Sequence, residues 1–217
     1  MLGMGSVNNE ELKAFKKIVD EQIKELDAFY EACAKELAAR LLAKVIPRTP
    51  VGDYQKDNIA DTYKRANKKK GIKKGDVKRD KKGNIKRSKY KMVSFETASG
   101  KRVSFKALSD KKGGTLRRGW TANSHKEAEN GSGRNAKEYA NSLKVIKKGG
   151  VYELTVSNPV NYAVYVENGH RTRGGKGWVP GQFFLRISEN ELRTIMPQVL
   201  ERRLKKWLRE MEGRMPK

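Results

Sequence analysis

The residue types that most often carry catalysis or bind metals are scarce in this chain. Its 217 residues include one cysteine, Cys33, and two histidines, His125 and His170. No Cys or His pair shows the two- to four-residue spacing of a zinc site. No Gly-x-Ser-x-Gly turn offers a serine nucleophile. We therefore expect no catalytic residue, no metal site and no cofactor.

His170 lies at the start of a glycine-rich basic segment, residues 170–181. It could act as a catalytic base or an anion ligand. We favour a loop residue that makes a local hydrogen bond or lies at an interface. Gly174-Gly175-Lys176-Gly177 does not match the G-x-x-x-x-G-K-[ST] phosphate loop, and no clear strand and helix flank it. The segment is expected to be a flexible connecting loop.

A group of aromatic residues lies near basic ones in the second half of the chain. Such rings can stack on nucleic-acid bases. Beside aliphatic residues such as Val164 and Val166 they are more typical of a core or a subunit interface, which we favour. Leu116 and Trp120 are expected in the same core. The aromatic residues of this group are Tyr162, Tyr165, Trp178, Phe183 and Phe184.

The strongest compositional signal is a formal net charge of +24. Residues 53–114 contribute +14 of it, with 21 Lys and Arg against 7 Asp and Glu. This charge attracts nucleic acid, an anionic membrane or an acidic protein surface. Lysine clusters broken by glycines are typical of loops or disordered chain. The clusters contain Lys68, Lys69, Lys70, Lys73, Lys74, Lys78, Arg79, Lys81 and Lys82.

Within this basic segment, Lys89–Glu96 and Lys101–Leu108 predict two strands of a hairpin, joined through Ala98-Ser99-Gly100. A long extension without its own core is usually functional, disordered or ordered by a neighbour. No stretch approaches the roughly 18 apolar residues of a membrane helix. The first residues do not resemble a signal peptide, and a lone cysteine fits a reducing compartment. We expect a soluble protein made in a cytoplasm.

Residues 8–46 predict one long helix, because apolar residues recur every three or four positions. Asn8 or Asn9 is expected to cap its start, and Pro47 and Pro50 are expected to end it. At about 1.5 Å per residue this helix spans about 55 Å, more than a small domain, so part of its stripe needs a partner. The stripe contains Leu12, Phe15, Val19, Ile23, Leu26, Tyr30, Cys33, Leu37, Leu41 and Val45.

The remaining elements are expected to be short until a second long helix. Leu116–Thr121 predicts a strand, and Ser142–Lys147 with Val151–Ser157 predicts a hairpin. Tyr162–Asn168 fits either a strand or a helix. We favour a short helix that ends at Gly169.

Ser188–Met211 predicts the final helix of the chain. Ser188 and Glu191 have the spacing of a capping box. Pro197 is expected to kink the helix.

Four blocks in a fixed order resemble one known family: Arg48–Gly52 (RTPVG), Thr115–Trp120 (TLRRGW), Asn161–Arg171 (NYAVYVENGHR) and Trp178–Leu185 (WVPGQFFL). They are similar to the phage tail-component family typified by gene product ten of coliphage HK-ninety-seven, over residues 10–52 and 114–212. In that family the first two blocks are usually nearly contiguous, and a Ser often precedes the Trp. Here a basic insertion separates the blocks, and Gly119 precedes Trp120.

The resemblance implies an α+β neck-protein core formed by residues 1–52 and 114–217. This core is expected to contain a long N-terminal helix, a small antiparallel sheet, a short helix and a long C-terminal helix. A basic insertion, 53–113, that contains a β-hairpin interrupts the core and departs from the family pattern. It also implies no catalytic residues. The implied structural and interface residues are Leu116, Trp120, Tyr162, Tyr165, Glu167, Gly169, His170, Arg171, Trp178, Pro180, Phe183 and Phe184.

The implied function is that of a structural neck or tail-completion protein at the head–tail or tail-top junction. The particle would be a tailed phage or a phage-tail-like particle, assembled from subunits made in the bacterial cytoplasm. The implied partners are further copies of the chain in a ring, expected to be a hexamer, and head-connector, tail-terminator or tail-tube proteins. No membrane partner is expected.

The alternative is a basic nucleic-acid-binding protein, and an enzyme such as a nuclease is the least favoured reading. The basic insertion could contact DNA or an acidic protein surface, and we slightly favour the protein surface. The two functions do not exclude each other, because a neck protein lies near the path of the DNA.

Overall fold

The chain divides into two compact units. Unit 1 consists of Met1–Ala43, Asn135–Val156 and Ser188–Lys217, and unit 2 of Lys44–Arg134 and Ser157–Ile187. Long helices near both ends, short helices and small antiparallel sheets confirm the predicted α+β class. The structure, a computed structural model, describes residues 9–96, 100, 102–109, 113–131, 133–172 and 174–213.

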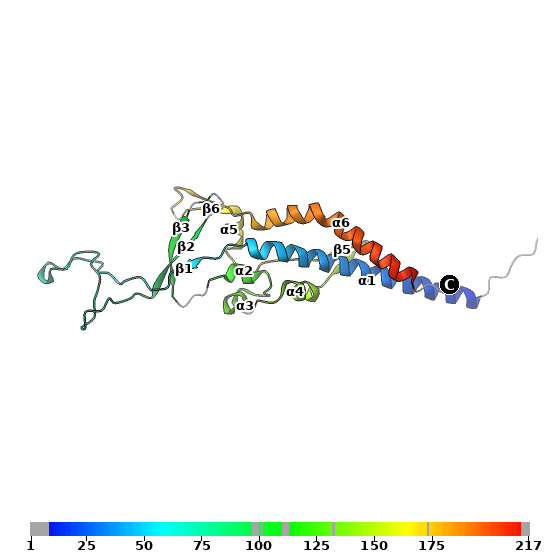
Figure 1. Cartoon of the computed structure of the whole chain (residues 1–217), viewed down its shortest axis with the longest axis horizontal. Helices are drawn as coiled ribbons and strands as arrows, with labels where there is room; N and C mark the ends of the chain where they lie inside the picture. Colours follow the sequence, from blue (N-terminus) through cyan, green and yellow to red (C-terminus); the bar gives the residue numbers. More distant parts are fainter. Residues whose placement is uncertain are drawn as a thin grey trace, which may run out of the picture. The chain divides into compact units, whose positions relative to one another are not determined.

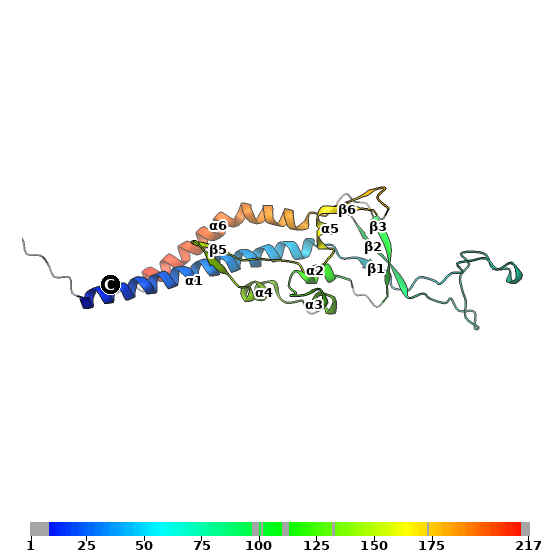
Figure 2. The same ribbon diagram turned by 180° about the vertical axis from the view of Figure 1, so that it is seen from behind.

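Unit 1 is built mainly on two long helices, α1 (Asn9–Arg48) and α6 (Phe184–Glu212), which lie side by side in both views (Figures 1 and 2). The rings of Phe29 and Trp207 meet with their centroids 5.2 Å apart. The guanidinium of Arg203 also forms an ion pair with Glu36. The predicted helix over 8–46 is confirmed, with Pro47 accommodated in its last turn.

The apolar stripe of α1 is exposed over the first part of the helix. Leu12, Phe15 and Ile23 keep 55%, 67% and 50% of their surface exposed. Farther along the helix, Cys33 and Leu42 are buried. The stripe therefore has more apolar surface than the chain itself buries, which is the pattern of a helix that needs a partner.

A β-hairpin packs on α1 within unit 1. Its strands are β4 (Ile146–Lys148) and β5 (Val151–Glu153). The ring of Tyr152 stacks on that of Tyr30 at 5.1 Å. The predicted hairpin is confirmed but shorter, because residues 136–142 form helix α4 (Ala136–Ser142).

Unit 2 contains a three-stranded antiparallel sheet with the order β1-β2-β3. The strands are β1 (Asp53–Tyr54), β2 (Tyr90–Glu96) and β3 (Arg102–Leu108). Val93 is buried and lies opposite Phe105. The predicted hairpin is therefore confirmed, although Ala98 and Ser99 of its turn lie outside the described residues.

Residues 55–89, between β1 and β2, form an arm that divides into two tips (Figures 1 and 2). We call it the forked arm. A bridge between Ala60 and Arg87 lies in its stem. Bridges between Thr62 and Val77 and between Asn67 and Ile72 lie in the first branch, and one between Arg79 and Ile85 in the second. No residue of the arm is buried. The forked arm thus has defined backbone pairing, although its composition is typical of loops or disordered chain.

Three short helices belong to unit 2: α2 (Thr115–Gly119), α3 (His125–Asn130) and α5 (Ala163–Asn168). The predicted strand at 116–121 is wrong. Leu116 and Trp120 are both buried and stand four positions apart, the spacing of one helix face. The predicted short helix at 162–168 is confirmed, and Gly169 follows it.

The segment 170–181 is not a simple loop. Strands β6 (Gly169–Arg171) and β7 (Trp178–Pro180) pair antiparallel, with His170 opposite Val179. The glycine-rich residues that looked like a connecting loop form the end of this hairpin. Short runs such as these carry little periodicity, so the pairing was not visible in the pattern.

Helix α6 begins at Phe184 rather than at Ser188. Ser188 is fully buried inside the helix, so the predicted capping box is wrong. Pro197 lies inside α6, and the helix bends between its orange and red parts in Figure 1. At the start of α1, Asn9 is the first helical residue and Asn8 lies outside the described residues.

Candidate functional site

The start of α6 is capped by a side chain from α5. The carboxylate of Glu167 accepts hydrogen bonds from the backbone N–H groups of Leu185 and Arg186, each at 3.0 Å. The first N–H groups of a helix have no partner within the helix, and its N-terminus carries partial positive charge. Glu167 satisfies both needs, and it performs the role that the sequence pattern had assigned to Ser188.

The backbone around Glu167 is held in return by the residues that precede α6. The N–H of Gln182 donates to the carbonyl of Val166 at 2.9 Å, and that of Phe183 donates to the carbonyl of Glu167 at 3.1 Å. Phe183 adopts φ +51°, a left-handed conformation that non-glycine residues rarely take. We call Val166–Gly169 together with Gly181–Arg186 the α5–α6 clasp.

Two glycines allow the clasp to close. A Cβ on Gly181 would lie 2.3 Å from the carbonyl oxygen of Glu167. A Cβ on Gly169 would lie 2.5 Å from the carbonyl oxygen of Val179, and Gly169 has φ +84°. At each glycine, two backbone segments therefore approach so closely that a side chain would force them apart.

A second contact joins α2 to the residues just after α1. The indole Nε1 of Trp120 donates to Oγ1 of Thr49 at 2.7 Å, and both residues are buried. The hydroxyl of Thr49 in turn donates to the carbonyl of Val45 at 2.8 Å. Arg117 donates to the carbonyl oxygens of Thr49, at 2.8 and 3.1 Å, and Pro47, at 3.1 Å. These bonds hold residues that are widely separated in the sequence.

Trp120 also connects this contact to the clasp. Its ring meets Phe184 edge-on, with centroids 6.1 Å apart and an interplanar angle of 82°. Leu116 is buried close by in the chain, and its carbonyl accepts from Nδ2 of Asn158 at 2.8 Å. The four sequence blocks, RTPVG, TLRRGW, NYAVYVENGHR and WVPGQFFL, are thus joined in one packed assembly within unit 2.

The remaining residues expected at this site lie on its surface. Tyr165 and Trp178 keep 58% and 60% of their surface exposed, and Val164 keeps 64%. Tyr162 is also exposed. Pro180 and Arg171 are exposed as well. We call Tyr162, Val164, Tyr165 and Trp178 the aromatic patch. The expected set is therefore divided into buried residues, exposed residues that are mostly apolar, and three half-buried residues, Glu167, His170 and Phe183.

An apolar pocket of about 500 Å³ lies within unit 2. One wall comes from the sheet, with Val93 and Phe105. The other wall includes Tyr162 of the aromatic patch, Val166 and Val179. Most of the lining residues are apolar, and His170 also contributes to the lining.

His170 lies in strand β6 rather than in a loop, and its contacts are local. Its Nδ1 lies 3.4 Å from the carbonyl oxygen of Tyr165, and its ring meets that of Tyr165 edge-on at 6.0 Å. Within the described part of the chain, no group of three or more His, Cys, Asp and Glu side chains could hold a metal ion. Burial raises the pKa of the Cys33 thiol, which disfavours the nucleophilic thiolate.

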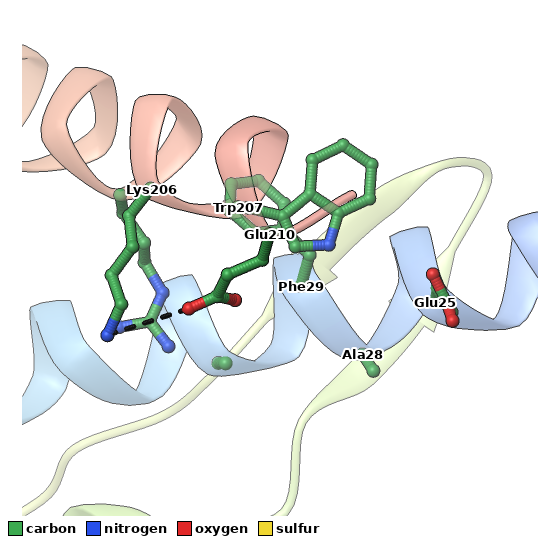
Figure 3. Close-up of a pocket in the computed structure, with 8 residues that line it drawn as sticks. Glu25, Ala28, Phe29, Lys206, Trp207 and Glu210 are labelled. Carbon is green, nitrogen blue, oxygen red and sulfur yellow. Dashed lines mark ion pairs between the residues drawn. The ribbon is translucent and has the colours of Figure 1, made fainter. Parts of the chain in front are cut away.

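Unit 1 has a separate groove between α1 and α6, shown in Figure 3. It measures about 360 Å³ and is lined by Phe29 and Trp207 together with charged residues. Lys206 forms an ion pair with Glu210 across 3.8 Å along its edge (Figure 3). No residue that the sequence singled out as functional, apart from α1 itself, contributes to this groove. We assign it to helix packing.

Polar contacts in unit 1 fix α1 to its neighbours. Asp27 accepts hydrogen bonds from Tyr152 and from Nζ of Lys147, the latter at 2.8 and 2.9 Å, and these bonds lower the pKa of Asp27. Burial alone would raise the pKa of Glu36, but hydrogen bonds from Arg40 and Arg203 outweigh it and hold the pKa below its usual value. These carboxylates are structural anchors.

Comparison with known protein families, with curated proteins and with solved structures finds no match for this chain. No helix in the described part of the chain is long and apolar enough to cross a membrane.

Proposed function

We propose that the chain is a structural neck or tail-completion subunit of a tailed phage or of a phage-tail-like particle. The observation that carries this proposal is the convergence of all four family-like blocks in one assembly of unit 2. The resemblance rests on the residues of the blocks and their order, whereas the packing rests on the contacts of Thr49, Trp120, Glu167 and Phe184. Function is carried by sites rather than by a fold as a whole, so the meeting of the blocks supports the proposal.

The site supports assembly better than catalysis. Its buried part consists of aromatic packing, a helix cap and glycine contacts, and its exposed part is mostly apolar, with Arg171 also exposed. Large exposed apolar side chains are frequent in protein–protein interfaces, in which Tyr and Trp often carry much of the binding energy. The aromatic patch is therefore proposed as one contact surface between subunits.

The exposed stripe of α1 supplies a second surface. Leu12, Phe15 and Ile23 lie on one helix face and are exposed in the isolated chain. Two different contact surfaces on one subunit allow head-to-tail contacts, and these close into a ring when the rotation between subunits fits. A ring, expected to contain six copies, and contacts to head-connector, tail-terminator or tail-tube proteins belong to this proposal.

The test is the oligomeric state of the purified chain and the assembly of particles that carry its variants. Tyr165→Ser combined with Trp178→Ser is expected to leave the circular dichroism spectrum unchanged and to abolish ring formation in light scattering. The matched control is Val151→Ser, which removes a 59% exposed apolar side chain at the hairpin of unit 1. If the native chain, the double variant and Val151→Ser all form rings equally well, the proposed contact surface is overturned.

In the particle, the same double variant is expected to yield unjoined heads and tails by electron microscopy. The Val151→Ser control should give joined particles. Normal infectious particles from the double variant would contradict a role for the aromatic patch in the junction.

A further inference from the structure

The forked arm has a branch point formed by a closed cycle of three backbone hydrogen bonds. The N–H of Asp61 donates to the carbonyl of Lys86, that of Lys86 to the carbonyl of Lys78, and that of Lys78 to the carbonyl of Asp61, each at 2.8 Å. Nζ of Lys78 also binds Oδ2 of Asp61 at 2.8 Å. Three short ribbons therefore meet at one point and hold two separate tips.

The first tip, residues 64–74, is a concentrated block of positive charge. It contains seven Lys and Arg and no Asp or Glu. Asn67 and Ile72 pair across its end, and Lys68–Lys70 form a 3-10 turn closed by Gly71 at φ +64°. A 3-10 turn has about three residues per turn, so successive lysines point about 120° apart.

The second tip, residues 79–85, is a tight turn built on Asp80. Its Oδ1 accepts from the N–H groups of Lys82 and Asn84 at 2.8 and 2.9 Å. Arg79, Lys81 and Lys82 extend from this turn and are exposed. The turn holds its three cations on a defined backbone.

The carboxylates of the arm shape it rather than neutralise the tips. Asp76 accepts from the backbone N–H of Lys73 at 2.6 Å, and Asp80 holds the second turn. A hydrogen bond from Lys78 holds the pKa of Asp61 below its usual range. Hydrogen bonds from Asn84 likewise hold the pKa of Asp80 below its usual range. Among the described residues, the one ion pair within the arm joins Lys78 to Asp61. The lysines of the tips thus present their full charge to solvent.

The composition of the tips favours a phosphate backbone over a protein surface. Protein interfaces bury an apolar core and are depleted in Lys, whereas Lys and Arg bind phosphates by releasing counterions. The tips carry no aromatic ring that could stack on an exposed base, so they have no means of holding single strands by stacking. Lysines that point in several directions suit a groove with phosphates on both sides.

We propose that the forked arm binds duplex DNA through its phosphates, without sequence preference, and that both tips hold the same duplex. This inference stands on the arm alone and does not rest on the proposed neck function. If the chain is a neck subunit but does not bind DNA, the DNA-binding proposal fails alone. If it binds DNA but is absent from particles, the neck proposal fails alone.

The test is fluorescence anisotropy of the full chain with a labelled mixed-sequence duplex over a salt series. The variant Lys68→Gln, Lys69→Gln, Lys70→Gln removes three cations from the first tip. Each phosphate contact contributes about −0.9 to the slope of log K against log salt, so the slope should become less negative by about 2.7. At about 0.15 M salt this corresponds to affinity weakened about 100-fold.

The matched control is Lys16→Gln, Lys17→Gln, Lys24→Gln, which removes three exposed lysines from α1 in unit 1. It makes the same change in net charge and should leave the slope nearly unchanged. Equal losses in both variants would mean that the total charge binds DNA and would overturn the role of the arm.

A second variant, Lys81→Gln with Lys82→Gln, tests whether both tips hold one duplex. Its loss in log K should add to that of the first variant, and the slope should become less negative by about a further 1.8. No effect of the second variant would contradict the two-tip grip. Absent duplex binding at about 0.15 M salt, or tighter binding of polyglutamate than of DNA, would overturn the proposal in favour of an acidic protein partner.

Discussion

The indole nitrogen of Trp120 donates a buried 2.7 Å hydrogen bond to the hydroxyl of Thr49, which stands 71 positions earlier in the chain. The forked arm and the sheet lie between these residues in the sequence. The bond therefore fastens the two ends of the long insertion to each other. Unit 2 keeps its core intact although the insertion interrupts the sequence.

Thr49→Val removes this acceptor while preserving the size of the side chain. The Trp120 N–H would be left buried without a partner, which costs about 1–3 kcal/mol in the free energy of unfolding. Urea unfolding followed by tryptophan fluorescence measures the loss. Thr194→Val, at an exposed position of α6, is the control and should change stability by less than about 0.5 kcal/mol.

Glu167→Gln removes the negative charge that caps α6 but keeps an acceptor oxygen. We expect a loss of about 1 kcal/mol, because the charge favours the positive end of the helix. The loss should shrink at high salt, since salt screens charge interactions. Glu153→Gln on the exposed strand β5 is the control. Equal stability of Glu167→Gln and the native chain would show that the carboxylate does not hold α6.

Gly181→Ala tests the close approach in the clasp. The added Cβ would lie 2.3 Å from a carbonyl oxygen, so the backbones must separate, and we expect a loss of about 3 kcal/mol or more. Gly169→Ala should lower the free energy of unfolding at least as much, because Gly169 has a positive φ in addition to its close backbone contact. The control is Gly175→Ala, with φ +73° and open space around it, which isolates the conformational cost of about 1 kcal/mol.

The pH dependence of unit 1 is expected to involve Asp27. Its hydrogen bonds from Lys147 and Tyr152 lower its pKa in the folded state below the unfolded value of about 3.9. This carboxylate therefore stabilises the fold above about pH 4, and its contribution is lost as the pH falls through the lower, folded pKa. Thermal unfolding of the native chain and Asp27→Asn should converge at low pH. A constant difference between them down to about pH 2 would contradict this role.

The sequence predicted the elements whose patterns are long or strongly marked. The stripe from Leu12 to Val45 predicted α1, and the runs Lys89–Glu96 and Lys101–Leu108 predicted the β2–β3 hairpin. Both signals are local in the sequence. The local resemblance of Tyr162–Asn168 to a helix was also confirmed.

The failures occurred where long-range contacts decide the structure. Leu116–Thr121 has strand-like residues, but burial of Leu116 and Trp120 on one side selects a helix. Ser188 has a good capping sequence, but Glu167 caps the helix four residues earlier. Neither Glu167 nor Gly181 could be assigned these roles before the clasp was seen.

Some elements carried signals that sequence analysis overlooked. Ser124 and Glu127 have capping-box spacing, and the hydroxyl of Ser124 accepts from the N–H of Glu127 at 3.2 Å at the start of α3. The branch point of the forked arm had no such signal. It depends on backbone bonds among Asp61, Lys78 and Lys86, which no side-chain pattern encodes.

The proposed neck role makes this chain a structural component of a particle. Quantitative mass spectrometry of gradient-purified particles from the native source tests it most directly. We expect a fixed, low copy number, close to that of other neck proteins and far below that of the tail-tube protein. Absence of the chain from particles, with abundant chain bound to DNA in the lysate, would contradict it.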